Sequence, residues 1–426
     1  MEKIFLDVEG ERNMIRFLPL KKVCKQIVDC PHESPEWLQE GITVIRNFNL
    51  VDGQLDLSDR YCVDEETYEK RIKRAVPSDG DIIFSREAPI GNCAIIPPNT
   101  KCCLGQRLVL LRVDIDVCSS EYLLAALQSQ YVKQQIEQVS KSGSIVSNFN
   151  ISDLKELIIP VVSQQETVSN ISATLNRKVR TNKEIIDSLE AMAKSLYDYW
   201  FVQFDFPDEN GKPYRTSGGE MVWNEQLKRE IPKGWKAIEY SELVDIENSS
   251  INPSSFGETV MEHYSIPAFD EDCMPAFDTA DTIQSGKYRV LKESFLVSKL
   301  NPQFKRIWNP YCLTDNAICS TEFMVYKPKD ITLRPICYAI ANSDGFYNHM
   351  VSKAISSTGS RKRIQPDVSI KYSLAFPLDR FVVDRFCSHY SPIMEKIKKA
   401  RLENYELKKL RDWLLPMLMN GQARVE

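Results

Sequence analysis

The stretch DIIFSREAP at 81–89 decides the organisation of this chain, because a related stretch, ESFLVSKLNP, returns at 293–302. Each has an apolar run, then Ser-Arg or Ser-Lys, and then a proline. A second pair follows in the same order: SKSGSIVSNFNISDLKELIIP at 140–160 and SSTGSRKRIQPDVSIKYSLAFP at 356–377 share a Gly-Ser step and a final proline. Matches that keep one order at a nearly constant offset indicate internal duplication. We therefore predict two homologous halves and a pseudo-two-fold internal repeat.

Length and composition agree with a two-part globular chain. The 426 residues suffice for two to four domains, and the 43% hydrophobic and 27% charged residues are typical of a folded, soluble protein. Short β-branched or aromatic runs such as RLVLLRV at 107–113 accompany helical patterns, which predicts a mixed α/β fold. No stretch of 18 apolar residues occurs, and the start, MEKIFLDVEGERN, lacks the pattern of a signal peptide. We expect a cytoplasmic protein that contacts no membrane.

A long amphipathic segment follows each globular half. No Pro or Gly occurs between Val161 and Val202, and apolar residues recur there at three- and four-residue steps, as in a coiled-coil seam. A similar stripe follows Pro392. A helix of this length needs a partner to bury its seam, so we predict that the two helices pack on each other rather than each on its own domain. The predicted seam and partner-contact residues are Ile171, Leu175, Ile185, Leu189, Met192, Leu196, Ile397, Leu407, Leu410 and Leu414.

These patterns predict five regions along the chain. The segment between the first helix and the second globular half is rich in Gly, Pro and charge, which is typical of an exposed connector. The predicted regions are a first globular domain at 1–162, a first long helix at 163–205, a connector at 206–233, a second globular domain at 234–378, and a second long helix with a C-terminal tail at 379–426.

No catalytic or metal-binding signature is present. The phosphate-binding, dinucleotide-binding, zinc-protease and nucleophile-elbow motifs are all missing. The nearest match is Asn301-Pro302-Gln303-Phe304, which resembles the [ND]-P-P-[YF] element of amino-methyltransferases, but Gln303 breaks it and no glycine-rich cofactor loop accompanies it. The 12 cysteines contain no C-x-x-C pair and the four histidines do not cluster, so we expect reduced, buried thiols and no metal.

Basic and hydroxyl residues in the repeated loops indicate binding of DNA instead. The net charge of −5 requires any DNA-binding surface to be a local patch. The Gly-Ser loops combine small hydroxyl residues with Lys and Arg, which suit phosphates and guanine edges, and their recurrence at matched positions favours a function over a solvated turn. The predicted DNA-binding residues are Ser85, Arg86, Lys141, Gly143, Ser144, Lys299, Lys305, Arg306, Gly359, Ser360, Arg361, Lys362 and Arg363.

Several segments resemble the specificity subunits of type I restriction-modification systems. The resemblance covers nearly the whole chain. It rests most specifically on LEAMAKSLYDYWFVQFDFP at 189–207 and LRDWLLPMLMNGQ at 410–422, with CLGQRLVLLR, IPKGW, EHYSIPAFDE and NAICSTEFMVYKP in support. The first half departs from the family at its start, having FLPLKKV where the second half has PKGW at 232–235. The exact N-terminal boundary of the first domain therefore stays open.

The resemblance implies a division of labour between subunits. Two target-recognition domains would each read one half of a bipartite, asymmetric DNA site, and two helices packed antiparallel would set the spacer. This chain would bind no cofactor. Two modification subunits carrying S-adenosylmethionine would methylate adenine, and motor-nuclease subunits would cleave. Two other classes remain as alternatives: a self-contained DNA methyltransferase or nuclease, and a coiled-coil scaffold that does not bind DNA.

Overall fold

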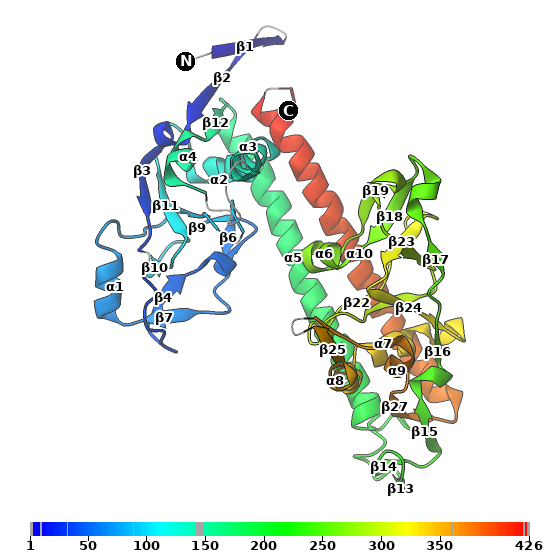
Figure 1. Ribbon diagram of the computed structural model, residues 1–426. Coiled ribbons are helices and arrows are strands. Elements are labelled where there is room, and N and C mark those ends of the chain that lie inside the picture. The colour runs from blue at the N-terminus through cyan, green and yellow to red at the C-terminus, as the bar shows by residue number, and fades with distance from the viewer. Residues whose placement is uncertain are drawn as a thin grey trace. The chain divides into compact units, whose positions relative to one another are not determined.

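The computed structural model divides the chain into two compact units. It describes residues 3–8, 11–31, 33–87, 89–141, 149–358, 361–420 and 422–423. Unit 1 comprises residues 1–181 and 406–426, and unit 2 comprises residues 182–405. Each unit therefore contains part of both long helices, which are labelled α5 and α10 in Figure 1. No helix in these ranges is both long and apolar enough to cross a membrane.

Unit 1 is a mixed α/β unit, and α5 continues from it into unit 2. Its elements are β1 (Lys3–Val8), β2 (Glu11–Pro19), β3 (Cys24–Asp29), β4 (Ile42–Ile45), β5 (Leu50–Val51), β6 (Gln54–Leu55), β7 (Tyr61–Val63), α1 (Glu65–Arg71), β8 (Ile82–Ser85), β9 (Cys93–Ile95), β10 (Cys102–Leu104), β11 (Leu108–Val113), α2 (Ser120–Gln128), α3 (Gln130–Lys141), α4 (Ile151–Glu156), β12 (Ile158–Val161) and α5 (Gln165–Tyr197).

Unit 2 is also mixed α/β, and α10 continues from it back into unit 1. Its elements are β13 (Met221–Asn224), β14 (Arg229–Pro232), β15 (Trp235–Glu239), β16 (Val244–Ile246), β17 (Ser250–Ile251), β18 (Val260–Tyr264), α6 (Ile266–Asp272), β19 (Ala276–Thr279), β20 (Lys287–Arg289), β21 (Phe295–Ser298), β22 (Ile307–Trp308), β23 (Ala317–Ser320), β24 (Phe323–Pro328), α7 (Arg334–Ala341), α8 (Asp344–Lys353), β25 (Ile355–Thr358), β26 (Arg361–Arg363), α9 (Pro366–Ser369), β27 (Ser373–Pro377) and α10 (Arg380–Met419).

The four-stranded sheets of the two units have the same strand order, and two further strand pairs correspond, although unit 2 adds β17 and β20 to its second sheet. An antiparallel sheet in the order β3-β11-β8-β9 in unit 1 corresponds to β16-β24-β21-β22 in unit 2. The parallel pair β4 and β10 corresponds to β18 and β23, and the antiparallel pair β2 and β12 corresponds to β15 and β27. The helices recur in the same order, with α2, α3, α4 and α5 matched by α7, α8, α9 and α10. The predicted duplication and mixed α/β class are confirmed.

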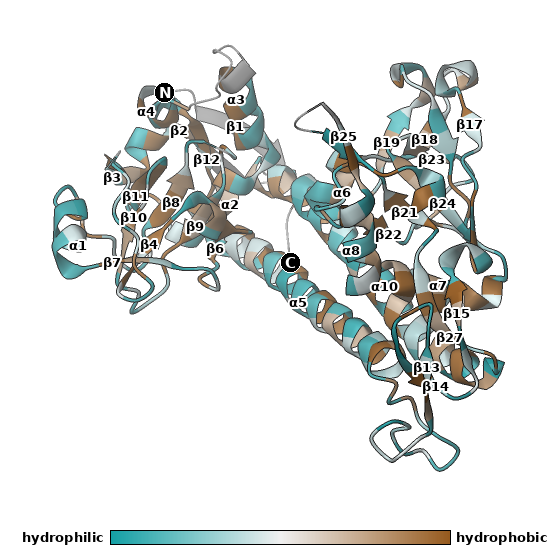
Figure 2. Cartoon of the chain, turned by 60° about the horizontal axis from the view of Figure 1, so that its bottom comes forward, coloured by the Kyte–Doolittle hydropathy of each residue, from teal (hydrophilic) through white to brown (hydrophobic). Residues whose placement is uncertain are grey.

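Each four-stranded sheet is buried on both faces. In unit 1, Phe84 and Val109 pack on one face while Ile83 and Leu110 pack on the other, as the two-residue period of a strand requires. The continuous apolar runs IIF and LVLL therefore form central strands rather than half-exposed ones. Figure 2 shows the strands of both units largely in the hydrophobic colour.

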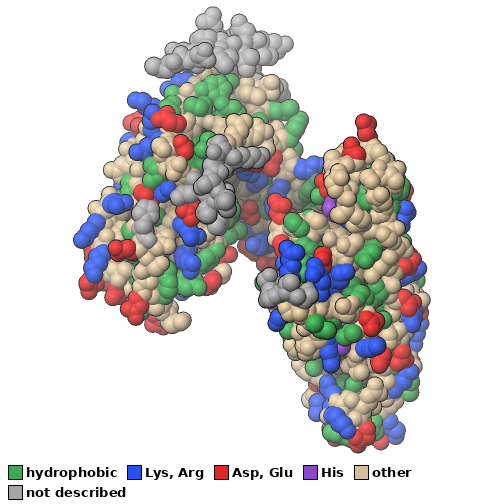
Figure 3. Space-filling model, in the orientation of Figure 1, with side chains coloured by type: hydrophobic (Ala, Val, Ile, Leu, Met, Phe, Trp, Pro, Cys, Tyr) green, Lys and Arg blue, Asp and Glu red, His purple; other side chains and the backbone are tan. Residues whose placement is uncertain are grey.

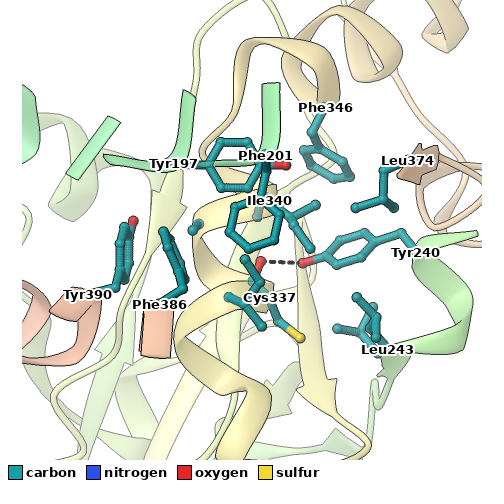
Figure 4. Close-up of a cluster of buried hydrophobic side chains, with 14 of the residues drawn as sticks. Tyr197, Phe201, Tyr240, Leu243, Cys337, Ile340, Phe346, Leu374, Phe386 and Tyr390 are labelled. Carbon is teal, nitrogen blue, oxygen red and sulfur yellow. Dashed lines mark hydrogen bonds between the residues drawn. The ribbon is translucent and has the colours of Figure 1, made fainter. Parts of the chain in front are cut away.

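The core of unit 2 is dominated by aromatic rings from several elements. Tyr197 and Phe201, at the end of α5, pack against Phe386 of α10. The buried Tyr240 donates its hydroxyl hydrogen to the backbone oxygen of Cys337 at 2.6 Å, as Figure 4 shows. Because this hydrogen bond satisfies the phenol, the ring can be fully buried at little cost. The long helices are thus anchored in the globular part of the unit.

Polar contacts show that α5 and α10 run antiparallel. In unit 1, Arg411 donates to the side-chain oxygen of Asn176 at 3.0 Å. In unit 2, Asn182 donates to the carboxylate of Glu403 at 2.8 Å. Rising numbers on α5 accompany falling numbers on α10 in these contacts, which confirms the expected antiparallel pairing. Buried polar pairs of this kind can fix helix register.

The predicted seam is wrong in phase at three positions. Ile185, Met192 and Leu410 are 45%, 50% and 43% exposed, respectively. The other predicted seam residues are at most partly exposed, and Leu189 and Ile397 pack against the core of unit 2. Buried positions of α5 are separated by three, four or seven residues, as in a helical seam, but they include small and polar residues that a count of apolar residues leaves out: Val168, Ser172, Val179, Asn182, Ile186, Ala193 and Tyr197.

The connector predicted at 206–233 is not uniformly exposed. A π-helical turn over Asp198–Val202 ends the first long helix, and the chain then forms the antiparallel pair β13 and β14. Phe206 and Ile231 are buried in the core of unit 2, where Phe206 stacks on Trp235 with ring centroids 5.2 Å apart. The Gly and Pro content of this segment reflects tight turns rather than an extended linker.

Candidate nucleic-acid interface

The side chains of Ser85 and Arg86 form hydrogen bonds within unit 1. The Ser85 hydroxyl donates to the backbone oxygen of Glu87 at 2.8 Å, and its side chain has no exposed surface. The guanidinium of Arg86 donates to Asp29 at 3.0 Å and to the backbone oxygen of Phe149 at 2.7 Å. The Phe149 amide also donates to the backbone oxygen of Arg86 at 3.1 Å. Both side chains are hydrogen-bonded within the unit, so the structure gives them a structural role rather than free donors for DNA.

Unit 2 repeats this arrangement at Ser298 and Lys299. The amide of Ile364 donates to the backbone oxygen of Lys299 at 3.1 Å, as Phe149 does to Arg86. Residues that are widely separated in the sequence, in the two repeated loops, thus lie side by side in both units. Lys141 ends α3, and its side chain lies outside the described residues. Gly143, Ser144, Gly359 and Ser360 also lie outside them.

Acidic neighbours neutralise two of the predicted basic residues in unit 2. Arg306 donates two hydrogen bonds to the Asp270 carboxylate at 2.6 and 2.7 Å. Arg363 makes a similar pair with Glu322 at 3.1 and 2.7 Å, and this hydrogen bonding holds the pKa of Glu322 below its usual value. The ammonium group of Lys305 donates to the backbone oxygen of Asn342, and burial lowers its pKa. These three side chains position the loops rather than present free charge.

Two basic residues of β26 remain available to a ligand. Arg361 and Lys362 are exposed, and the part of the chain that the structure describes offers their side chains no hydrogen bond or ion pair. Lys299 lies nearby in the fold, because its backbone accepts the hydrogen bond from Ile364, just beyond β26. Figure 3 shows Lys and Arg side chains gathered on the face of unit 2 near the position of β25 in Figure 1. This basic patch suits phosphate groups.

One exposed aromatic residue beside the basic patch was missed as a binding residue. Phe304 is 56% exposed, and the Arg306 guanidinium lies 5.2 Å from its ring centroid. The sequence drew attention to Asn301–Phe304 only as an incomplete methyltransferase motif. Comparison with the repeat could have found Phe304, because the matching segment EAPIG at 87–91 has no aromatic residue.

The cysteines have the environment of structural thiols. Ten of the 12 are buried and two are partly exposed, and all are free. Burial raises the pKa of Cys93 and of Cys102 to about 12, which keeps these thiols protonated and unreactive. Within the described ranges, no three Cys, His, Asp or Glu side chains are grouped as metal ligands would be.

Comparison with known proteins finds similarity to one family. Residues 52–191 match the family model of the type I restriction modification DNA specificity domain. The MjaIX specificity subunit of Methanocaldococcus jannaschii is 24% identical over 370 residues, which cover 82% of this chain and 78% of that protein. The HindI specificity subunit of Haemophilus influenzae is 25% identical over 141 residues, which cover 32% of this chain and 30% of that protein.

A solved structure shares the fold. The S subunit of a type I restriction-modification system from M. genitalium aligns with 96% of this chain and 97% of its own, with a TM-score of 0.55 at 13% identity. This likeness covers both repeats and both long helices. The matched specificity domain and the relative that spans most of the chain make this protein similar in sequence to the specificity subunits of type I restriction-modification systems, and the solved structure shows that it shares their fold.

Proposed function

We propose that each globular region reads one half of a bipartite, asymmetric DNA site. The observation that carries this proposal is a duplicated topology with different surface loops. The four-stranded sheets of the two units have the same strand order, whereas the loops that follow β8 and β21 differ, SREAPIGN against SKLNPQFK. Because the sheets are alike and the loops differ, we expect the two units to recognise different DNA sequences. In unit 2, Arg361, Lys362 and Lys299 form the proposed contact surface, and in unit 1 the proposed residues are Lys141, Gly143 and Ser144.

Methylation and cleavage would belong to partner subunits. The internal repeat offers equivalent surfaces to two identical modification subunits, as pseudo-symmetry allows. These subunits would bind S-adenosylmethionine and methylate adenine, and motor-nuclease subunits would cleave; the complex would work in the cytoplasm. The exposed Ile185, Met192 and Leu410 on the long helices are proposed partner contacts.

The helix pair is proposed to set the spacer between the half-sites. Inserting four residues after Asn182 and four near Glu403, which face each other, would lengthen both helices by about 6 Å and keep the seam nearly in phase. We expect a spacer longer by about two base pairs and unchanged half-sites. An unchanged spacer in the methylated sites of this variant would refute the ruler function.

The experiment that tests the proposal is methylation mapping. A host would express this chain with its partner subunits, and long-read sequencing would locate methylated adenines. We expect one bipartite motif with two unlike halves. A methylated motif that persists without this chain would place the enzyme and its specificity elsewhere in the system. Methylation by the isolated chain with S-adenosylmethionine would show that this chain is itself a self-contained enzyme. Absence of salt-sensitive DNA binding by the assembled complex would favour a scaffold.

A further inference from the structure

Between β21 and β22, unit 2 has a tight turn that presents one aromatic ring to solvent. The Phe304 amide donates to the backbone oxygen of Asn301 at 2.9 Å, which closes the turn. Asn301 has a φ of 48°, in the left-handed region that costs most residues energy. Phe304 is 56% exposed, although burying a phenyl ring is normally favourable. Asparagine adopts this region more readily than most residues, so Asn301 suits the turn, and the turn leaves the ring of Phe304 uncovered.

The turn is tied to the basic residues of β26. The Asn301 amide donates to the backbone oxygen of Lys362 at 2.7 Å, and the Lys362 amide donates back to the Asn301 side chain at 2.9 Å. A further bridge pairs Leu300 with Arg363. The turn that carries Phe304 and the strand that carries the exposed side chains of Arg361 and Lys362 are thus hydrogen-bonded to each other.

Neighbouring side chains fix the orientation of the ring. The Arg306 guanidinium lies 5.2 Å from the ring centroid, and its Nε and one terminal nitrogen donate to Asp270. On the other side, the Tyr347 hydroxyl donates to the backbone oxygen of Gln303 at 3.3 Å, and Pro302 is buried. Because the backbone of the turn is held before any ligand arrives, insertion of the ring would not require the turn itself to be ordered.

We infer that Phe304 is a wedge that inserts between two base pairs of the half-site read by unit 2. The inference rests on the proposed function and specifies how unit 2 engages its DNA. An apolar side chain flanked by cations is the combination with which proteins unstack a base step while neutralising the adjacent phosphates. A flexible pyrimidine–purine step would be the easiest to open, so the wedge would favour such a step in that half-site.

Among the described residues of unit 1, the turn that corresponds to Asn301–Phe304 carries no exposed aromatic ring. This turn contains Pro89, Ile90 and Gly91, and Ile90 packs against the core of its own unit. The deformation is therefore confined to one half-site, which distinguishes it from a general property of the duplicated framework.

The test uses the full chain assembled with its modification subunits on the mapped target duplex. The fluorescent base 2-aminopurine, which brightens on unstacking, would replace adenines one at a time in the half-site read by unit 2 and in the other half-site. Phe304→Ala would be compared with Phe304→Trp and with Phe256→Ala, a control at a 41% exposed phenylalanine of the same unit. Equal melting temperatures would show that the variants fold.

We expect the wild-type complex to brighten the probe at one step, in one half-site only. Phe304→Ala should abolish this signal and weaken specific binding about 5- to 100-fold, the range for loss of an aromatic ring stacked on a base. Phe304→Trp should retain both, and Phe256→Ala should match the wild type.

Other results would overturn the inference in distinguishable ways. Unchanged affinity and unchanged fluorescence in Phe304→Ala would refute the wedge while leaving half-site reading intact. Loss of co-purifying modification subunits with normal DNA binding would assign Phe304 to a protein contact instead. A wild-type complex without salt-sensitive DNA binding would refute the proposed function, and the wedge with it.

Discussion

Replacing Arg86 by Met separates a structural role from DNA contact. The substitution keeps most of the side-chain volume but removes the guanidinium that donates to Asp29 at 3.0 Å and to the Phe149 backbone oxygen at 2.7 Å. The Arg86 and Asp29 side chains are only 10% and 20% exposed. Breaking one partner of a buried ion pair costs about 3–5 kcal/mol. The partial exposure of Asp29 places this variant near the lower value, about 3 kcal/mol.

Hydrogen–deuterium exchange would measure this loss in unit 1 alone. Amides of β8 and β11 that exchange through unfolding of unit 1 should exchange more than 100-fold faster, the equivalent of about 3 kcal/mol. The matching amides of β21 and β24 in unit 2 provide an internal control with the same topology. Lys299→Met, at the repeated position, should change stability by less than about 1 kcal/mol because its side chain makes no such pair among the described residues.

A second substitution tests the cause of the destabilisation. Combining Arg86→Met with Asp29→Asn removes the carboxylate that Arg86→Met alone would leave uncompensated, so part of the lost protection should return. The reasoning is refuted if Arg86→Met leaves exchange in unit 1 unchanged yet weakens DNA binding. That result would return Arg86 to the DNA surface that the sequence predicted.

Three further predictions concern the basic residues of β26, the buried face of α5 and a buried thiol. Arg361→Gln or Lys362→Gln should alter recognition of only the half-site read by unit 2. Loss of a phosphate contact should lower the salt dependence of DNA affinity by about one unit of slope, and loss of a base contact should cost ~1–3 kcal/mol of discrimination at one position. Binding curves at several salt concentrations distinguish the two, and effects on both half-sites would contradict modular reading. Ile186→Ala should cost about 2–4 kcal/mol in chemical denaturation and its exposed neighbour Ile185→Ala less than about 1, since only the former is buried; the reverse order would restore the predicted seam. Burial raises the pKa of Cys93 to about 12, so at pH 8 the native thiol should resist iodoacetamide, should react faster as the pH rises toward 12, and should react readily once unfolded, as mass spectrometry would detect.

The sequence alone was sufficient to predict the domain organisation of the chain. Repeated segments identify a duplication because homologous halves must preserve the same packing positions, and the structure confirms this in two sheets of identical strand order. Buried strands such as IIF and LVLL were predictable because their apolar character is continuous. The long helices were predictable from periodicity and from the absence of Pro and Gly over about 40 residues.

Only the tertiary structure decided which face of each helix is buried and which charges are free. Counting apolar residues placed Ile185 and Met192 in the seam, but the true seam passes through Asn182 and Ala193, whose burial depends on what lies across from them on α10. Likewise, the sequence does not show whether a loop arginine pairs with a phosphate or with a carboxylate that is distant in the sequence. Arg86 forms an ion pair with Asp29, while the Arg361 side chain has no hydrogen bond or ion pair among the described residues. Local sequence patterns show the period of helices and strands and the internal repeat. Which residues are buried and which charges are paired depends on segments that only the fold brings together.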